Sequence, residues 1–192
     1  MKTKTNILYF ELSKPTSMHL NFEFKAKAAS LAKPEEILRK QNPLFIGEDH
    51  QTDTYFHVPY GRLKLREGLI ENALIHYERT NTANAKESKV LLYQHQPDAS
   101  LKKILTAALG VKTIVDKKRK IYFIDNVKFH FDEVKELGTF IEVEAIDKDN
   151  NIGIEKLKQQ CAGYIALLQI EEKDFVAESY SDLLLAKKSS TM

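Results

Sequence analysis

The chain has 192 residues, of which 43 % are hydrophobic and 29 % are charged, and its formal net charge is +2. This composition is ordinary for a soluble globular protein, and so small a net charge excludes a global field that recruits nucleic acid. The single cysteine, Cys161, excludes an intrachain disulfide and is expected in the core. Apolar runs are too short to cross a membrane, so we expect a cytoplasmic protein.

The length suits one domain with a sizeable core and is short for two. We therefore expect a single domain over residues 18–187. Residues 1–17 fit the pattern that follows poorly and are expected to be an N-terminal extension, and residues 188–192 a short tail.

The first half of the predicted domain is rich in strands. Strict alternation of apolar and polar residues in "NFEFKAKA" predicts a strand at about 20–28, because successive side chains leave a strand on opposite faces. Pro34 is placed to open a helix at about 34–41. The same alternation, with turn residues between several segments, predicts four more strands at about 52–58, 62–67, 73–79 and 88–95.

The second half begins with a helix at about 100–109, which Gly110 ends. Strands are predicted at about 112–124, 127–132 and 139–146, and helices at about 152–168 and 178–187. Strands dominate, and the helices do not alternate regularly with them. This order favours an α+β fold with an antiparallel sheet rather than a fold of repeated strand–helix–strand units.

The polar faces of several predicted strands are sorted by charge. The row in "GRLKLRE" carries only cations, and so do those around 79 and 117–119, whereas the row at 142–144 carries only acids. The rows at 21–27 and 128–132 are mixed. Side chains two apart on a strand lie ~7 Å from each other, so like charges repel, and an ordinary solvated face intersperses both signs.

One explanation is a sheet closed into a barrel, with these rows facing inward and the apolar rows facing outward under the helices. Ordinary solvated faces remain the alternative for each strand taken alone. The cations of the tunnel would be Lys25, Lys27, Arg62, Lys64, Arg66, Arg79, Lys117 and Arg119. Its acids would be Glu23, Asp132, Glu142 and Glu144.

Such a tunnel suits a highly charged anion together with a divalent cation. Arginine forks match phosphate oxygens, and lysine supplies a point charge. Neighbouring carboxylates suit Mg²⁺ or Mn²⁺, which prefer hard oxygen ligands. So many cations around one small ligand indicate a triphosphate rather than a monophosphate.

An ordered set of motifs resembles the CYTH superfamily, named for class IV adenylate cyclase and thiamine triphosphatase. "NFEFK" is similar to the family's E-x-E-x-K, with Asn21 in place of the first glutamate. "QTDTYF", "GRLKLRE", "VDKKRKIY" and "FHFDEVKELGTFIEVEAI" follow in the expected order. The tail "ESYSDLL" resembles the S-Y-x-x-L-L ending of class IV cyclases. The resemblance extends from about residue 19 to residue 185.

The resemblance implies an eight-stranded antiparallel barrel, the triphosphate tunnel, with helices packed outside. It implies Mg²⁺ or Mn²⁺ held by Glu23, Glu142 and Glu144, with Asp132 close by. The phosphate ligands that it implies are Lys25, Arg62, Lys64, Arg66, Arg79, Lys117 and Arg119, joined by Lys86 from the 80–89 loop, and the strand pattern adds Lys27 to them. Lys25 and Arg119 are the expected catalytic residues. Asn21 removes one carboxylate, which leaves open whether one metal or two bind.

The function implied first is a class IV adenylate cyclase that converts ATP to cyclic AMP and pyrophosphate. A triphosphatase acting on tripolyphosphate, thiamine triphosphate or a nucleoside triphosphate is the alternative, because both reactions need the same ligands. A non-catalytic binder of polyphosphate or nucleotide is a third reading, motivated by Asn21. The expected partner is a small triphosphate, without nucleic acid or membrane, and a homodimer is compatible with the family.

Overall fold

A computed structural model describes residues 17–79 and 86–190, with side chains left undescribed at 17–19, 79 and 86. The strands are β1 (Ser17–Lys27), β2 (Leu44–Phe56), β3 (Arg62–Glu67), β4 (Ala73–Arg79), β5 (Lys86–Gln94), β6 (Val111–Ile124), β7 (Val127–Val134) and β8 (Gly138–Asp147). The helices are α1 (Ala32–Arg39), α2 (Ala99–Leu109), α3 (Ile154–Leu167) and α4 (Tyr180–Ser189), with a 3₁₀ turn η1 (Glu172–Asp174).

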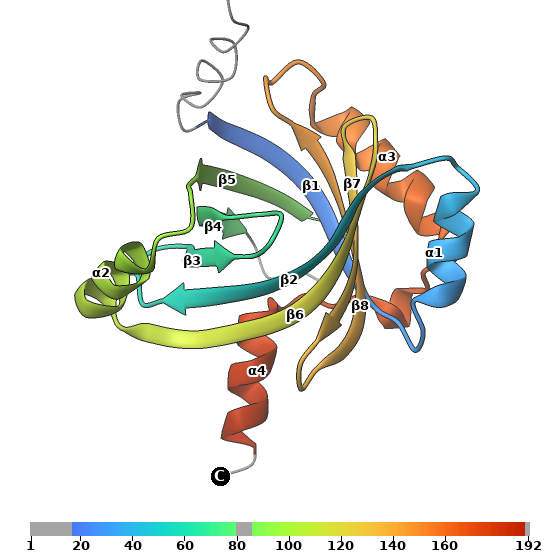
Figure 1. Cartoon of the computed structure of the whole chain (residues 1–192). Coiled ribbons are helices and arrows are strands. Elements are labelled where there is room, and N and C mark those ends of the chain that lie inside the picture. The colour runs from blue at the N-terminus through green and yellow to red at the C-terminus, as the bar shows by residue number, and fades with distance from the viewer. Residues whose placement is uncertain (1–16, 80–85, 191–192) are drawn as a thin grey trace, which may run out of the picture.

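The eight strands form one closed antiparallel barrel in the order β1-β5-β4-β3-β2-β6-β7-β8 (Figure 1). The ring closes at β1, which pairs with β5 on one side and with β8 on the other. The longest pairing joins β2 to β6, from Leu44 opposite Phe123 to Phe56 opposite Val111. The predicted α+β fold, an eight-stranded antiparallel barrel with helices outside, is confirmed.

The main hydrophobic core lies outside the barrel, between its wall and helices α1 and α3. Phe24, Phe129 and Val143 supply the outward apolar rows of three neighbouring strands, and Leu38 and Leu157 supply the helix side. Cys161 is fully buried in this layer, as the sequence predicts. Because period two sends the apolar rows outward here, the polar rows of the same strands face the interior of the barrel.

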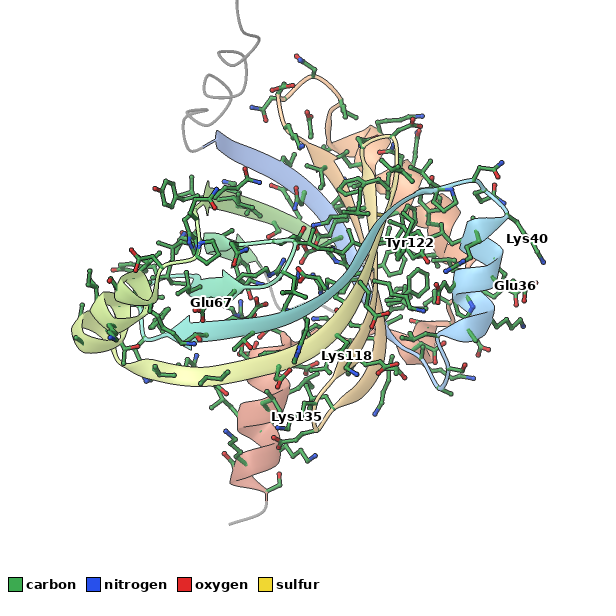
Figure 2. All side chains as sticks on the ribbon, in the orientation of Figure 1. Glu36, Lys40, Glu67, Lys118, Tyr122 and Lys135 are labelled. Atoms are coloured by element: carbon green, nitrogen blue, oxygen red, sulfur yellow. The ribbon has the colours of Figure 1, made fainter. Side chains whose placement is uncertain are left out.

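The contact between β6 and α1 includes hydrogen bonds from two side chains of β6 to Glu35 of α1. Figure 2 shows Tyr122 lying between the strand and the helix, while Glu36 and Lys40 lie on the outer side of α1. The Tyr122 hydroxyl donates to Glu35 at 2.6 Å, and Lys120 donates to the other oxygen of Glu35 at 2.9 Å. Burial of this carboxylate is therefore balanced by donors, which fixes α1 on the wall.

The helix and strand positions agree with the predicted ones to within a few residues, except at β2. This strand begins at Leu44 rather than at about 52. Its first half escapes the period-two signal because both faces are polar: Asp49 and Gln51 are buried, whereas Glu48 and His50 lie on the other face. The predicted extension 1–17 lies outside the described residues except for Ser17.

In the described part of the chain, none of the helices has the length and apolar character needed to cross a membrane.

Candidate active site

The inner face of the barrel brings charged residues of distant strands into register. Lys25 of β1 and His130 of β7 both lie opposite Glu142 of β8. In the next layer, Glu23 of β1 and Lys128 of β7 both lie opposite Glu144. Directly opposed positions in antiparallel strands place Cβ atoms about 4.5–5.5 Å apart, so these side chains meet inside the ring.

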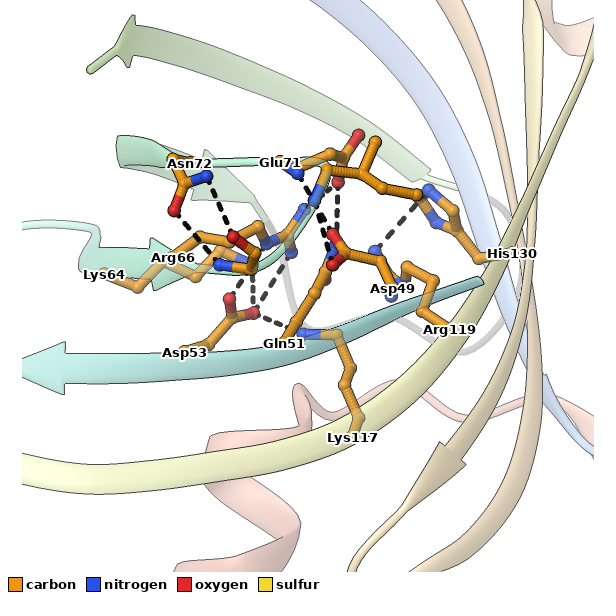
Figure 3. Close-up of polar contacts among 12 residues, drawn as sticks. Asp49, Gln51, Asp53, Lys64, Arg66, Glu71, Asn72, Lys117, Arg119 and His130 are labelled. Carbon is orange, nitrogen blue, oxygen red and sulfur yellow. Dashed lines mark hydrogen bonds and ion pairs between the residues drawn. The ribbon is translucent and has the colours of Figure 1, made fainter. Parts of the chain in front are cut away.

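The first network is centred on Asp53 of β2, which is fully buried (Figure 3). Its carboxylate accepts from Lys117 at 2.7 Å, from Lys64 at 3.1 Å, and from two nitrogens of Arg66 at 2.9 and 3.1 Å. Burial alone would raise the pKa of Asp53, but Arg66 and Lys117 hold it well below its usual range. Three cations from two strands, β3 and β6, are thus gathered around one carboxylate.

Lys117 is the cation of this network whose pKa is lowered. Burial lowers its pKa from 10.5 to about 7 despite the attraction of Asp53, and the charges of Arg66 and Arg119 contribute to the lowering. This lysine therefore changes its charge within the physiological pH range.

The second network is centred on Arg119 of β6. Its guanidinium binds Asp132 through two nitrogens, at 2.7 and 2.5 Å, and Glu142 at 2.6 Å. Lys25 approaches Glu142 at 3.1 Å from the other side. Burial alone would raise the pKa of Glu142, but Lys25 and Arg119 hold it well below its usual range.

The C-terminal segment enters this second network. The Tyr180 hydroxyl, at the start of α4, donates to Asp132 at 2.8 Å. Lys25 lies 4.1 Å from the centre of the Tyr180 ring and donates to the backbone oxygen of Glu178 at 3.1 Å. The tail motif around Tyr180 thus fixes the position of Lys25 and Asp132.

Acids and a histidine on β7 and β8 could hold a divalent cation. Ligand atoms of His130, Glu142 and Glu144 all lie within 4.8 Å of one another. Burial raises the pKa of Glu144, and the charges of Glu23 and Glu142 add to the rise against Lys128. A cation placed here would relieve that repulsion, and carboxylate oxygens are the ligands that Mg²⁺ and Mn²⁺ prefer, so the residues present fit such a metal.

His130 is better placed to orient these acids than to bind the metal itself. Its Nε2 lies 3.5 Å from Arg119 Nη1, a group that can only donate, so Nε2 is the acceptor and Nδ1 carries the proton. Nδ1 lies 3.6 Å from an oxygen of Glu142 and of Glu144. Burial, with the charges of Arg119 and Lys128, lowers the pKa of His130 to about 3, so the ring is neutral.

The remaining predicted residues lie in different places. Arg62 pairs with Asp182 of α4 at 2.8 Å, and Lys27 is exposed at the end of β1. Register places Lys86 opposite Glu23 and Arg79 opposite Ser88, but the side chains of Lys86 and Arg79 lie outside the described ones. Asn21 Oδ1 is buried without a hydrogen-bond partner in the described structure.

Four interior side chains are absent from the site predicted from the sequence: Asp53, Lys128, Gln51 and Glu71. Asp53 lies in the quoted "QTDTYF" motif, and the alternation of β2 around it could have placed it inward. Lys128 was assigned to a mixed row without a role. Gln51 and Glu71 gave no usable signal, because the first lies where both strand faces are polar and the second lies on a loop. The sorted cation rows are therefore neutralised by acids from neighbouring segments.

The family model of the CYTH domain matches residues 19–180. The chain belongs to the CYTH domain family. No curated protein matches it significantly.

Solved structures similar to this CYTH domain show the same fold. The PH1012 protein of Pyrococcus horikoshii OT3 superimposes with a TM-score of 0.69 at 21 % identity, covering 85 % of this chain and 98 % of that one. A candidate adenylate cyclase of Vibrio parahaemolyticus gives 0.70 at 16 % identity, with 86 % and 97 % covered.

A further solved structure has the same fold at lower similarity. HpAC1 of Hippeastrum, an adenylyl cyclase candidate described with a dominant triphosphatase activity, gives a TM-score of 0.56 at 12 % identity, with 90 % and 96 % covered. At these identities the likeness establishes the fold, and the activities belong to the proteins that carry them.

Proposed function

We propose that this CYTH domain is a metal-dependent enzyme that cleaves a triphosphate inside its barrel, with the conversion of ATP to cyclic AMP and pyrophosphate as its leading reaction. One observation carries the proposal. Arg119, Lys25 and Tyr180 converge on two carboxylates, those of Asp132 and Glu142. These groups come from strands far apart in the sequence and from the tail that resembles class IV cyclases. The tail motif thus belongs to the charged centre.

In this reaction the ATP 3′-hydroxyl attacks the α-phosphorus, the bond to the bridging oxygen of the β-phosphate breaks, and the hydroxyl proton passes to solvent. Glu142 and Glu144 would hold the metal, with Glu23 and Asp132 nearby. A bound Mg²⁺ or Mn²⁺ supplies charge neutralisation at the phosphates and a lower pKa of the attacking hydroxyl. Arg119 and Lys25 stabilise the charge that develops on the leaving pyrophosphate.

The cation row of the first network binds the rest of the phosphate chain. Lys64, Arg66 and Lys117 already converge within 3.1 Å of one carboxylate, Asp53. The same donors can bind phosphate oxygens, because carboxylate and phosphate groups are both anionic acceptors with similarly spaced oxygens. Asp53 then keeps the cations oriented and reduces their mutual repulsion.

Hydrolysis of a triphosphate is the second candidate. A cavity of about 60 Å³ is lined by Tyr55, His57, Arg62 and Ser181 among others. It has room for a few waters, and water is the nucleophile that a triphosphatase needs. The activity described for HpAC1 favours the same reaction.

The experiment is to incubate the protein with ATP, and separately with tripolyphosphate, in the presence of Mn²⁺ or Mg²⁺. Cyclic AMP with pyrophosphate supports the cyclase, whereas ADP with phosphate, or cleaved tripolyphosphate, supports the hydrolase. If both substrates stay intact, the proposal of an enzyme is wrong.

Adjacent residues on β6 give a matched test of the assigned groups. Arg119 is buried in the barrel, whereas Lys118 is exposed on its outer face, as Figure 2 shows. We expect Arg119→Gln to lower kcat/KM by about 10²-fold or more, since a preorganised charge at the reacting phosphates is lost. Lys118→Gln should leave kcat/KM unchanged, and an equal loss in both variants would contradict the assignment.

A further inference from the structure

Three donors from three strands converge on one carboxylate inside the barrel (Figure 3). Gln51 Nε2 of β2 and Arg66 Nη1 of β3 each donate to Glu71 Oε2 at 2.9 Å. Lys128 of β7 donates to the other oxygen, Oε1. Burial alone would raise the pKa of Glu71, but Lys128 and Arg66 hold it well below its usual range, so the carboxylate is charged.

Glu71 belongs to the turn between β3 and β4, residues 68–72, and not to a strand. Asp49 anchors this turn from below, accepting from the backbone N–H of Leu69 at 2.6 Å, of Ile70 at 3.1 Å and of Glu71 at 3.0 Å. The outer side of the turn faces solvent, and Leu69 is 84 % exposed. Residues 68–72 contribute no side chain to the two hydrophobic clusters, so an outward movement of the turn would break its hydrogen bonds to Asp49 and leave that packing in place.

The donors around Glu71 are of the kind that bind a phosphoryl group. Two cations and an amide surround it, and Arg66 also binds Asp53, which joins this position to the row of Lys64 and Lys117. A terminal phosphate carries more negative charge than a carboxylate and offers three oxygens to the same donors.

We propose that Gln51, Arg66 and Lys128 form a phosphate subsite, that Glu71 occupies it in place of the terminal phosphate, and that a triphosphate binds by displacing Glu71. This inference rests on the proposed function, because it assigns a position to one end of the same substrate. It adds Gln51 and Lys128 to the expected phosphate ligands. It also identifies Glu71 as a group of the protein that competes with phosphate for this subsite.

The test is the affinity for tripolyphosphate, measured by titration calorimetry in EDTA so that no metal contributes. Glu71→Gln keeps the shape of the side chain and removes its charge. We expect its dissociation constant to fall by on the order of tenfold to a hundredfold relative to the unaltered protein, since charge-assisted contacts no longer have to be broken. An unchanged or weaker affinity overturns the inference.

Two further variants separate this effect from a general change of charge. Glu67 is a neighbouring acid whose side chain is 34 % exposed and binds Lys102 of α2. Glu67→Gln removes this charge and should leave the affinity for tripolyphosphate unchanged. In a Lys128→Met background the gain from Glu71→Gln should vanish, because the subsite is broken. A gain from Glu67→Gln as large as that from Glu71→Gln, or a full gain without Lys128, counts against the subsite.

A measurement on the unaltered protein covers the case in which a variant does not fold. Hydrogen exchange of the Leu69–Asn72 amides should quicken when tripolyphosphate binds, because the turn leaves Asp49 as Glu71 is displaced. Binding with unchanged protection there overturns the inference and leaves the proposed function intact. If tripolyphosphate binds neither to the unaltered protein nor to any variant, with Mn²⁺ present as well as in EDTA, the proposed function fails as well.

Discussion

At the scale of single residues, Lys117 links the charge of the barrel to pH. Its pKa in the folded protein, about 7, lies below its ordinary value of 10.5 because of burial. The folded state therefore binds fewer protons than the unfolded state between these values. The contribution of Lys117 to the free energy of unfolding is fully present above pH 10.5 and is lost as the pH falls through 7.

The same titration should govern phosphate binding. Only the protonated form of Lys117 attracts a phosphate, so we expect the affinity for tripolyphosphate to weaken by up to about tenfold per pH unit above pH 7. Tripolyphosphate changes its own charge in this range, so the informative quantity is the difference from Lys117→Met, measured by calorimetry from pH 6 to 9. Equal slopes for the two proteins would refute the role of Lys117.

Single residues also show how much of the site can be predicted from the sequence. The alternation of period two predicts which side chains point into the barrel, and it does so for Lys117, Arg119, Glu142 and Glu144. Their partners are not readable, because the register between strands decides which acid meets which cation. Asp53 meets Lys117 only because β2 pairs with β6 and β3 at particular positions, and Glu71 enters the site from a turn.

At the scale of elements, one glycine of the β3–β4 turn and one of helix α3 have contrasting surroundings. A Cβ atom at Gly68 would lie 2.6 Å from Asp49 Oδ2 and 2.9 Å from the backbone oxygen of Glu71. A Cβ at Gly163, in the exposed part of α3, meets nothing within 4 Å. The same substitution should therefore act with opposite sign at the two positions.

We expect Gly68→Ala to lower the free energy of unfolding by about 1–3 kcal/mol, since the turn must shift against the carboxylate that anchors it. Gly163→Ala should raise it by about 0.5–1 kcal/mol, because alanine restricts the unfolded chain and favours helix. Urea denaturation of both variants measures these changes. A loss in Gly163→Ala or a gain in Gly68→Ala would show that the packing around these positions is misassigned.

The elements themselves were largely predictable because most strands have one apolar and one polar face. The exception is informative: β2 begins at Leu44, in a stretch where both faces carry polar residues. The outer face of this stretch carries Glu48 and His50 where other strands carry apolar residues, and this removes the contrast on which a period-two prediction depends.

At the scale of the whole molecule, charged networks inside the barrel lie beside a smaller apolar cluster that includes Val115, Val134 and Phe140, and the larger apolar layer lies outside, under α1 and α3. Buried ion pairs contribute little net stability, because the cost of removing charges from water offsets their attraction. A ligand that binds only the folded barrel should therefore stabilise it clearly. With Mn²⁺ and tripolyphosphate at ~100 times their dissociation constant, the free energy of unfolding should rise by about 2.7 kcal/mol.

Thermal unfolding with and without tripolyphosphate and Mn²⁺ measures this change, and EDTA should reverse the part that depends on metal. Arg119→Gln should lose most of the stabilisation, and Lys118→Gln should keep it. A melting temperature that does not respond to either ligand would be incompatible with a triphosphate site inside the barrel.

The closure of the ring at β1 also has a consequence for synthesis of the chain. Lys25 is made early and Glu142 late, yet they lie directly opposite each other at the seam between β1 and β8. A nascent chain that has not yet released β8 from the ribosome has half of the seam and no paired acid for this lysine. Non-local pairing of this kind forms slowly. Competence to bind substrate should therefore appear in the same step that seals the seam.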